Sequence, residues 1–150
     1  MTPAAFELLD VRVDDGPSSR LLDGVTFSAL RGTCTAVVGH VGSGKSTLLR
    51  VIAGLVSPVA GQVRVFGEQL GGRSYEGRRA HRLDVGFVFE ATGLIGNLTV
   101  GDNIGLALRY HDEGRLGAAT IAARVEQVAA EVGVERELDE PAHRVNVSVR

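Results

Sequence analysis

One lysine stands in a short glycine-rich stretch whose residue types suit phosphate binding. Residues 39–46 read GHVGSGKS, and Lys45 is the only lysine among the 16 lysine and arginine residues of the chain. The stretch matches the pattern G-x-x-x-x-G-K-[ST] at every fixed position. In this pattern the glycines let main-chain N–H groups approach phosphate oxygens, and the lysine places a compact charge on the outer phosphates. The spacing therefore predicts a site for a nucleoside triphosphate.

The loop residues are predicted to serve both the phosphates and a metal ion. The hydroxyl of Ser46 is expected to bind Mg²⁺, and that of Thr47 to reach a nearer phosphate oxygen. The positive end of the following helix dipole points at the same phosphates. The alternative, a chance glycine-rich turn, is expected in about one chain in a hundred of this length. The predicted nucleotide-binding residues are Gly39, His40, Val41, Gly42, Ser43, Gly44, Lys45, Ser46 and Thr47.

A buried strand before the loop and a helix after it are needed to position these groups. Residues 33–39 (TCTAVVG) become fully apolar towards their end, which is typical of a strand buried on both faces of a sheet. Residues 46–55 are predicted to be helical, with Gly54 near the end of the helix. Other strands are predicted at 6–13, 24–30, 62–67 and 85–90, and other helices around 100–110 and at 118–132, the last ending at Gly133.

Length and composition indicate one globular domain without a basic surface for nucleic acid. The chain has 150 residues, a net charge of -2 and 44% hydrophobic residues. Its single cysteine, Cys34, permits no internal disulfide and fits a reducing compartment. The N-terminus has acidic residues where a signal peptide needs basic ones, and no apolar run could span a bilayer. We therefore expect a cytoplasmic chain.

Longer stretches around the loop resemble the ATP-binding subunits of ABC transporters. The sequence VVGHVGSGKSTLLRVIAGLVSPVAGQVRVFGEQL is similar to the P-loop, helix and following strand of that family. LLDGVTFSALRG upstream and VGFVFEATGLIGNLTVGDNI downstream resemble its flanking segments. The resemblance covers residues 6 to about 135. The stretch LIGNLTVGDNI is closest to the Mla/Mce-type lipid-trafficking branch.

The resemblance implies an α/β fold, a P-loop NTPase of the ABC-ATPase type. A β-rich N-terminal part and a RecA-like core would occupy residues 1–90, and the start of a helical subdomain residues 91–150, incomplete before the Walker B strand. It also implies that the chain binds ATP and Mg²⁺ and, in a complete domain, hydrolyses ATP to energise a membrane transporter. The implied partners are a transmembrane permease and a second ATPase subunit, on the inner face of the cell membrane, with no nucleic acid.

Two positions depart from the family pattern near the nucleotide. Glu90 stands where the family has a glutamine that ligates Mg²⁺; a carboxylate is still a metal ligand, so Ser46 and Glu90 are the predicted metal ligands. Family members often stack adenine on an aromatic ring after the first strand, and here Asp14 and Asp15 occupy that loop. We therefore expect no base stacking.

The tail holds a copy of a catalytic motif in the wrong setting. Residues 137–141 read ELDEP, like the family's Walker B aspartate and glutamate, but charged residues precede them where an apolar strand is needed. Asp139 and Glu140 are therefore expected in a solvated loop. Residues 141–150 fall where the family has its glycine signature, and the glycines are missing. No catalytic residue is predicted within the chain.

Alternative functions remain open on the sequence. A nucleotide-binding regulatory module that does not hydrolyse ATP, or a degenerate fragment of an ABC ATPase, fits the same motifs. A small-molecule kinase is a further alternative, which the family-like residues 85–104 disfavour. Where the family meets its permease, this chain has Leu94, Ile95 and Leu98, which either form a contact surface or belong to the core of the helical subdomain.

Overall fold

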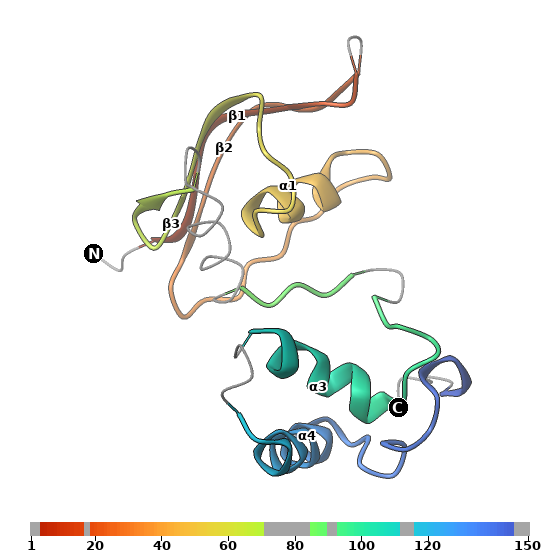
Figure 1. The fold of residues 1–150 in the computed structure, drawn as a ribbon. Coiled ribbons are helices and arrows are strands. Elements are labelled where there is room, and N and C mark those ends of the chain that lie inside the picture. The colour runs from red at the N-terminus through yellow and green to blue at the C-terminus, as the bar shows by residue number, and fades with distance from the viewer. Residues whose placement is uncertain (1–3, 17–18, 71–84, 90–92, 112–115, 146–150) are drawn as a thin grey trace. The chain divides into compact units, whose positions relative to one another are not determined.

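An antiparallel sheet forms the larger part of the first of two compact units (Figure 1). The computed structural model describes residues 4–16, 19–70, 85–89, 93–111 and 116–145, divided between the units Met1–Phe87 and Val88–Arg150. The order of the strands in the sheet is β2-β1-β3-β4, and every pair is antiparallel. The strands are β1 (Ala4–Asp14), β2 (Arg20–Leu30), β3 (Ala60–Val65) and β4 (Glu68–Gln69). The predicted strands at 6–13, 24–30 and 62–67 are thereby confirmed.

One face of this sheet packs on helix α1 (Lys45–Ile52) to form the core of the first unit. In β3 the buried residues Val63 and Val65 alternate with exposed ones, as expected for a strand with one buried face. On α1, Leu48, Val51 and Ile52 recur at helical spacing and are buried against the strands. The sheet therefore fixes the position of the helix that follows the glycine-rich loop.

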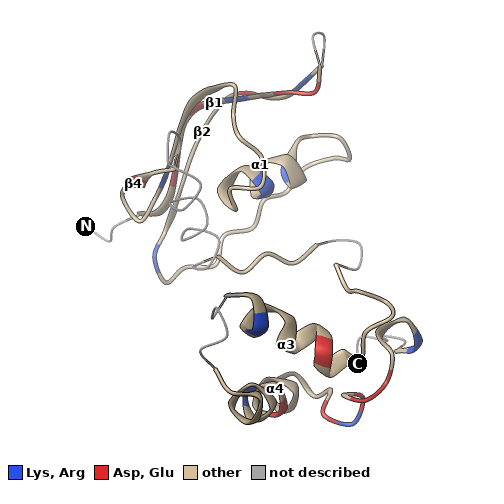
Figure 2. Cartoon of the chain, viewed as in Figure 1, with Lys and Arg blue, Asp and Glu red and all other residues tan. Residues whose placement is uncertain are grey.

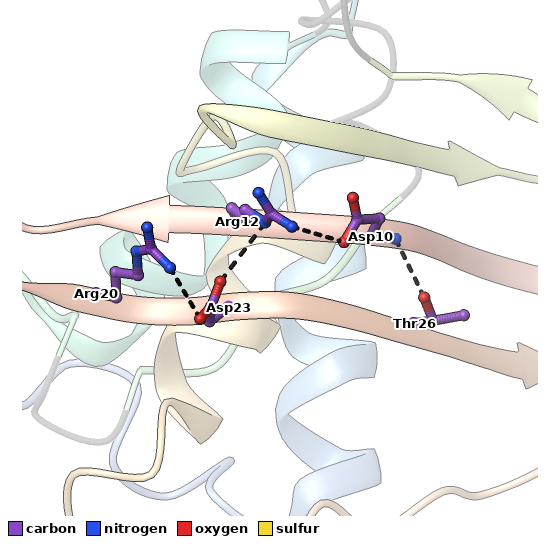
Figure 3. Close-up of polar contacts among 5 residues, drawn as sticks. All are labelled: Asp10, Arg12, Arg20, Asp23 and Thr26. Carbon is purple, nitrogen blue, oxygen red and sulfur yellow. Dashed lines mark hydrogen bonds and ion pairs between the residues drawn. The ribbon is translucent and has the colours of Figure 1, made fainter.

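A row of charged side chains joins β1 to β2 on the surface of the sheet (Figure 3). Arg12 of β1 lies 3.5 Å from Asp10 and 3.5 Å from Asp23 of β2, and Arg20 lies 3.0 Å from Asp23. The amide N–H of Asp10 donates to the hydroxyl of Thr26 at 3.1 Å. All these groups are exposed, so the pairs add little free energy, and they lie where the register between β1 and β2 shifts.

Two of the predicted strands, 33–39 and 85–90, are not strands in the described structure. Residues 33–39 and 85–89 belong to no ladder, and Val38 and Val88 are 87% and 94% exposed. An apolar sequence favours a buried strand, but a strand forms only beside a hydrogen-bonded neighbour, and the described part of the chain places no strand next to either segment. The last residue of the predicted strand 85–90, Glu90, lies outside the described residues.

Helix α1 ends earlier than the predicted helix at 46–55. Ala53 is its C-cap, and Gly54 follows in the left-handed conformation with φ of 69°. The N–H of Leu55 donates to the carbonyl of Arg50 at 2.9 Å, which closes the end of the helix in the manner of a Schellman motif. Gly54 thus marks the end of the helix, and Leu55 lies beyond it.

The second unit is built on two helices, α3 (Val100–His111) and α4 (Ala118–Val132), and a 3-10 turn η1 (Ala142–Arg144). The helices predicted around 100–110 and at 118–132 are confirmed, as is Gly133 as the C-cap of α4, with φ of 74°. A Cβ atom on Gly105 of α3 would lie 3.2 Å from a methyl group of Val125, so the glycine lets α4 approach closely.

None of the helices in the described ranges combines the length and apolar content that a membrane span needs.

Candidate nucleotide-binding site

The glycine-rich loop turns sharply into α1 by using two left-handed glycines. Gly42 has φ of 83° and Gly44 has φ of 86°, a conformation that residues with a Cβ adopt only at a cost. Gly44 is the N-cap of α1, and its carbonyl accepts the first helical hydrogen bond, from the N–H of Leu48 at 2.8 Å. The residues at these two positions therefore set the path of the loop.

The loop also packs tightly against strand β2. A Cβ atom on Gly44 would lie 2.6 Å from the carbonyl oxygen of Leu21 and 2.8 Å from a methyl group of Leu22. A Cβ atom on Gly39 would lie 2.7 Å from the hydroxyl of Ser43. Since β2 belongs to the core sheet, these contacts fix the start of α1 on a rigid support.

The ammonium group of Lys45 folds back over the loop. Its Nζ donates a hydrogen bond to the carbonyl oxygen of His40 at 2.7 Å, and the N–H of Ser43 lies 3.3 Å from the same oxygen. Lys45 is half-buried, and none of the ion pairs among the described residues includes it. The site thus holds a positive charge whose only described partner is a neutral carbonyl.

The first turn of α1 presents further donors. Within the described ranges, the amide N–H groups of Lys45, Ser46 and Thr47 have no acceptor, and no acidic side chain lies in this turn. Figure 2 shows this distribution of charge, since α1 carries basic positions and no acidic position. Unpaired N–H groups, the positive end of the helix dipole and one lysine therefore lie together in one turn, an arrangement that suits an anion.

Of the two predicted metal ligands, Ser46 and Glu90, only Ser46 lies within the described residues. Ser46 is exposed at the start of α1, whereas Thr47 is buried beneath it. Glu90 lies outside the described residues. No cluster of three histidine, cysteine or acidic side chains suited to a metal ion occurs in the part of the chain that is described. A Mg²⁺ ion here would take few protein ligands and complete its shell with phosphate oxygens and water, which is its usual preference.

The end of the β1–β2 hairpin is acidic where the family often has an aromatic ring. Asp14 and Asp15 are exposed there, and the N–H of Asp15 donates to the carbonyl of Ser19 at 2.7 Å. The described aromatic residues of the first unit are Phe6, Phe27, Phe66 and Phe87, none of which belongs to this hairpin end.

The copy of the Walker B motif in the tail is a turn, as predicted, but it has a structural role that the sequence did not indicate. Asp139 and Glu140 are exposed and belong to no strand. The carbonyls of Leu138 and Glu140 accept hydrogen bonds of 2.9 Å from the N–H groups of Gly101 and Val100, the first residues of α3. The motif therefore caps a helix through its main chain, and its carboxylates take no part.

Residues 93–98, hereafter the 93–98 loop, lead into α3 and carry the predicted permease contact. Leu94 and Ile95 are 51% and 43% exposed, and Leu98 is half-buried. The interpretation of all three as subdomain core is therefore wrong for Leu94 and Ile95. The structure adds two residues to this region that sequence reasoning missed, Asn103 and His143, whose side chains bond the backbone of the loop.

Comparison with known proteins places this geometry in a family. The ABC transporter profile matches residues 22–148. The methionine import ATP-binding protein MetN of Cutibacterium acnes is 41% identical over 90 residues, 60% of this chain and 25% of that protein. The Fe(3+) ions import ATP-binding protein FbpC of Mesorhizobium japonicum is 38% identical over 123 residues, 81% of this chain and 31% of that protein. The chain spans about a quarter to a third of the length of these relatives.

Solved structures show the same fold, an ATP-binding cassette. The cassette MJ0796, solved as a dimer bound to ADP and Pi, superposes with a TM-score of 0.84 and 25% identity, covering 94% of this chain and 63% of that one. The cassette cbiO1 of Clostridium perfringens, part of the transporter complex cbiONQ, gives a TM-score of 0.79 and 23% identity over 96% of this chain and 56% of that one. The predicted fold class is confirmed.

The finer resemblance to the Mla/Mce-type branch is wrong, because the relatives are import ATP-binding proteins, chiefly of the MetN type. In the structure the stretch LIGNLTVGDNI makes local contacts at the start of α3. The Thr99 hydroxyl accepts the backbone N–H of Asp102 and so caps α3, while the Asn103 side chain holds the loop before the helix. Those contacts are local and do not depend on which cargo a transporter carries.

Proposed function

The chain belongs to the ABC transporter family, and on that premise we propose that residues 39–47 bind the phosphates of ATP in a cassette that energises import. The supporting observation is the set of donors around the loop. The unpaired N–H groups at the start of α1 and the ammonium of Lys45 lie in one turn without a carboxylate. A ligand with several anionic oxygens would satisfy these donors together.

The proposed ligand is Mg-ATP rather than free ATP. The exposed hydroxyl of Ser46 would hold the metal ion, which when bound would neutralise charge on the outer phosphates. Lys45 would exchange its hydrogen bond to the carbonyl of His40 for one to a phosphate oxygen. Glu90 is proposed as a second metal ligand on the resemblance alone.

The proposed partners are a membrane permease and a second cassette. The relatives are named as import proteins, a cassette of the same fold is part of a transporter complex, and another forms a dimer. The exposed Leu94 and Ile95 are proposed to contact the permease. A chain with these partners would lie at the inner face of the cell membrane.

A second candidate is a nucleotide-binding module that does not hydrolyse ATP. It is favoured by the setting of Asp139 and Glu140, which are exposed in turns and occupy no strand end. Both candidate functions require the phosphate site. They differ in whether the protein hydrolyses ATP.

The phosphate site is tested by calorimetric titration of Mg-ATP into the purified chain and its Lys45→Ala variant. Loss of the lysine should raise Kd at least about a hundredfold, about 2.8 kcal/mol, because a charged donor to the phosphates disappears. Arg50→Ala is the matched control, since it removes a basic residue from the last turn of the same helix. The control should bind within about threefold of the parent, about 0.6 kcal/mol.

Circular dichroism of both variants should match that of the parent chain. Binding by Lys45→Ala within threefold of the parent would show that the loop is no phosphate site. An equal loss in both variants would indicate a general charge effect instead of a specific contact.

A further inference from the structure

The side chain of Asn103 bonds both peptide units that flank Ile95 in the 93–98 loop. Its Oδ1 accepts a hydrogen bond from the N–H of Ile95 at 2.8 Å, and its Nδ2 donates to the carbonyl of Ile95 at 3.1 Å. The same Nδ2 donates to the carbonyl of Thr99 at 2.9 Å. One amide group thus makes three contacts that join the first turn of α3 to the loop before it.

His143 supplies a second contact from a distant part of the chain. Its Nδ1 lies 2.7 Å from the carbonyl oxygen of Gly96, a residue 47 positions away. Because that oxygen only accepts hydrogen bonds, Nδ1 carries the proton. The N–H of Ala142 donates to the carbonyl of Leu98 at 2.9 Å, so η1 is bonded to the loop by main chain as well.

These contacts hold apolar side chains outside the core. The loop turns at residues 95–98, where the N–H of Leu98 donates to the carbonyl of Ile95 at 3.0 Å. Leu94 and Ile95 are exposed beside the bonded peptide units. An exposed apolar loop gains no burial from its own fold, so its shape depends on such polar contacts.

We propose that Asn103 and His143 are positioning residues that fix the 93–98 loop in the shape in which Leu94 and Ile95 meet the permease. This role rests on the proposed function, since the permease contact is itself a proposal. Neither residue belongs to the loop of residues 39–47 that is proposed to bind the phosphates. Loss of either contact should loosen the loop and weaken the partner contact while nucleotide binding stays unchanged.

The chain offers a matched pair of substitutions within one short segment. Asn103→Asp keeps the size and the acceptor of the side chain, but removes both donated hydrogen bonds and sets a negative charge beside two carbonyl oxygens. Asn97→Asp makes the same chemical change in the 93–98 loop itself, where the described structure gives Asn97 no hydrogen bond. Only the first substitution should act on the loop.

Hydrogen exchange of the full chain measures the loop directly. In Asn103→Asp, the amide of Leu98 should exchange about tenfold faster than in the parent, since its acceptor, the carbonyl of Ile95, loses the hydrogen bond from Asn103 that orders it. Amides in the middle of α4 should exchange at the parent rate. Asn97→Asp should leave all these rates unchanged. Equal rates in Asn103→Asp and the parent would overturn the proposal.

The partner contact is measured by crosslinking from Leu94→Cys in a Cys34→Ser background, because Cys34 is exposed. The probe is a co-expressed membrane subunit of a methionine importer, the transporter class of the relatives. Asn103→Asp should lower the crosslink yield at least about fivefold, while Asn97→Asp leaves it unchanged and Kd for Mg-ATP stays within about twofold in both. An undiminished yield in Asn103→Asp would reduce Asn103 to a structural residue.

His143 gives an independent variant away from the start of α3. His143→Leu removes the donor to Gly96 and should also lower the crosslink yield, whereas His143→Asn places an amide N–H near the position of Nδ1 and should restore it. Equal yields from these two variants would overturn the role of His143. If Leu94→Cys in the Cys34→Ser background gave no crosslink while Asn103 and His143 are unchanged, the proposed permease contact itself would be overturned. This failure is distinguishable because the contacts of Asn103 and His143 are then intact.

Discussion

The ammonium nitrogen of Lys45 lies 2.7 Å from the carbonyl oxygen of His40, a residue of the same glycine-rich loop. A lysine held in this way is pre-positioned, since its long side chain is already folded over the site where an anion would bind. The carbonyl is a neutral partner, so a phosphate oxygen is a stronger acceptor for the same donor. We therefore expect Lys45 to act through the compact shape of its ammonium group as well as through its positive charge.

Lys45→Arg should weaken Mg-ATP binding at least about tenfold, although the charge is kept. The guanidinium is planar and broad, and the half-buried position over the loop suits a compact ammonium. Calorimetric titration measures the loss. The control is Arg50→Lys, the reverse exchange at the other end of α1, which should leave Kd unchanged. Full affinity in Lys45→Arg would show that any cation suffices.

Gly44→Ala should destabilise the first unit more than Gly42→Ala does. Both glycines are left-handed, which costs an alanine about 1–2 kcal/mol. At Gly42 the new methyl group meets open space, whereas at Gly44 it would lie 2.6 Å from the carbonyl of Leu21, which adds about 1–3 kcal/mol of overpacking. Urea unfolding, monitored through hydrogen exchange of the α1 amides, measures the difference in the free energy of unfolding between the two variants. Equal losses would contradict the contact with β2.

ATP and GTP should bind within about tenfold of each other, a difference of about 1.4 kcal/mol. The hairpin end carries Asp14 and Asp15 where a stacking ring would select the base, so affinity should come from the phosphates. Competition of each nucleotide against a fluorescent analogue measures the ratio. A larger preference for ATP would point to a base contact elsewhere in the chain.

Acid should loosen the second unit through Asp102. The guanidinium of Arg109, 2.9 Å away, and the hydroxyl of Thr99 hold the pKa of the Asp102 carboxyl below its ordinary value of 3.8. A lowered pKa in the folded state means that the stabilisation is complete above the unfolded pKa and is lost as pH falls through the folded one. Helix content followed from about pH 5 to about pH 2 measures the loss.

Asp102→Asn should remove this pH dependence, because it removes the titrating group. Asp139→Asn is the control, since Asp139 is an exposed carboxyl of the same unit and belongs to none of the described ion pairs. A parent-like acid transition in Asp102→Asn would assign the effect to another group.

Residues 1–150 alone should bind Mg-ATP and release phosphate no faster than the uncatalysed reaction. Hydrolysis requires a group that positions the attacking water and charge stabilisation in the transition state. The described P-loop supplies Lys45 and the donors of α1, which would hold the phosphates without activating water. Phosphate release at saturating Mg-ATP is the measurement, with Lys45→Ala as the control for contaminants. Turnover that disappears in this control would contradict the prediction and would direct attention to Asp139 and Glu140.

The sequence by itself determined the features whose physics is local. The glycine-rich loop could be recognised as a candidate phosphate site because its glycines and Lys45 lie within eight consecutive residues. Helix α4 and its end at Gly133 followed from apolar spacing and a left-handed cap. The turn at Asp139 and Glu140 followed from the charged residues before it.

The tertiary structure alone decided the features that depend on neighbours far along the chain. Residues 33–39 have the composition of a buried strand, yet they form none, because strand formation requires a hydrogen-bonded partner that composition does not reveal. The packing of Gly44 on Leu21 depends on where β2 lies. The bond from His143 to Gly96 joins residues 47 positions apart, and no spacing rule connects them. Such contacts arise from packing, which is a property of the folded chain as a whole.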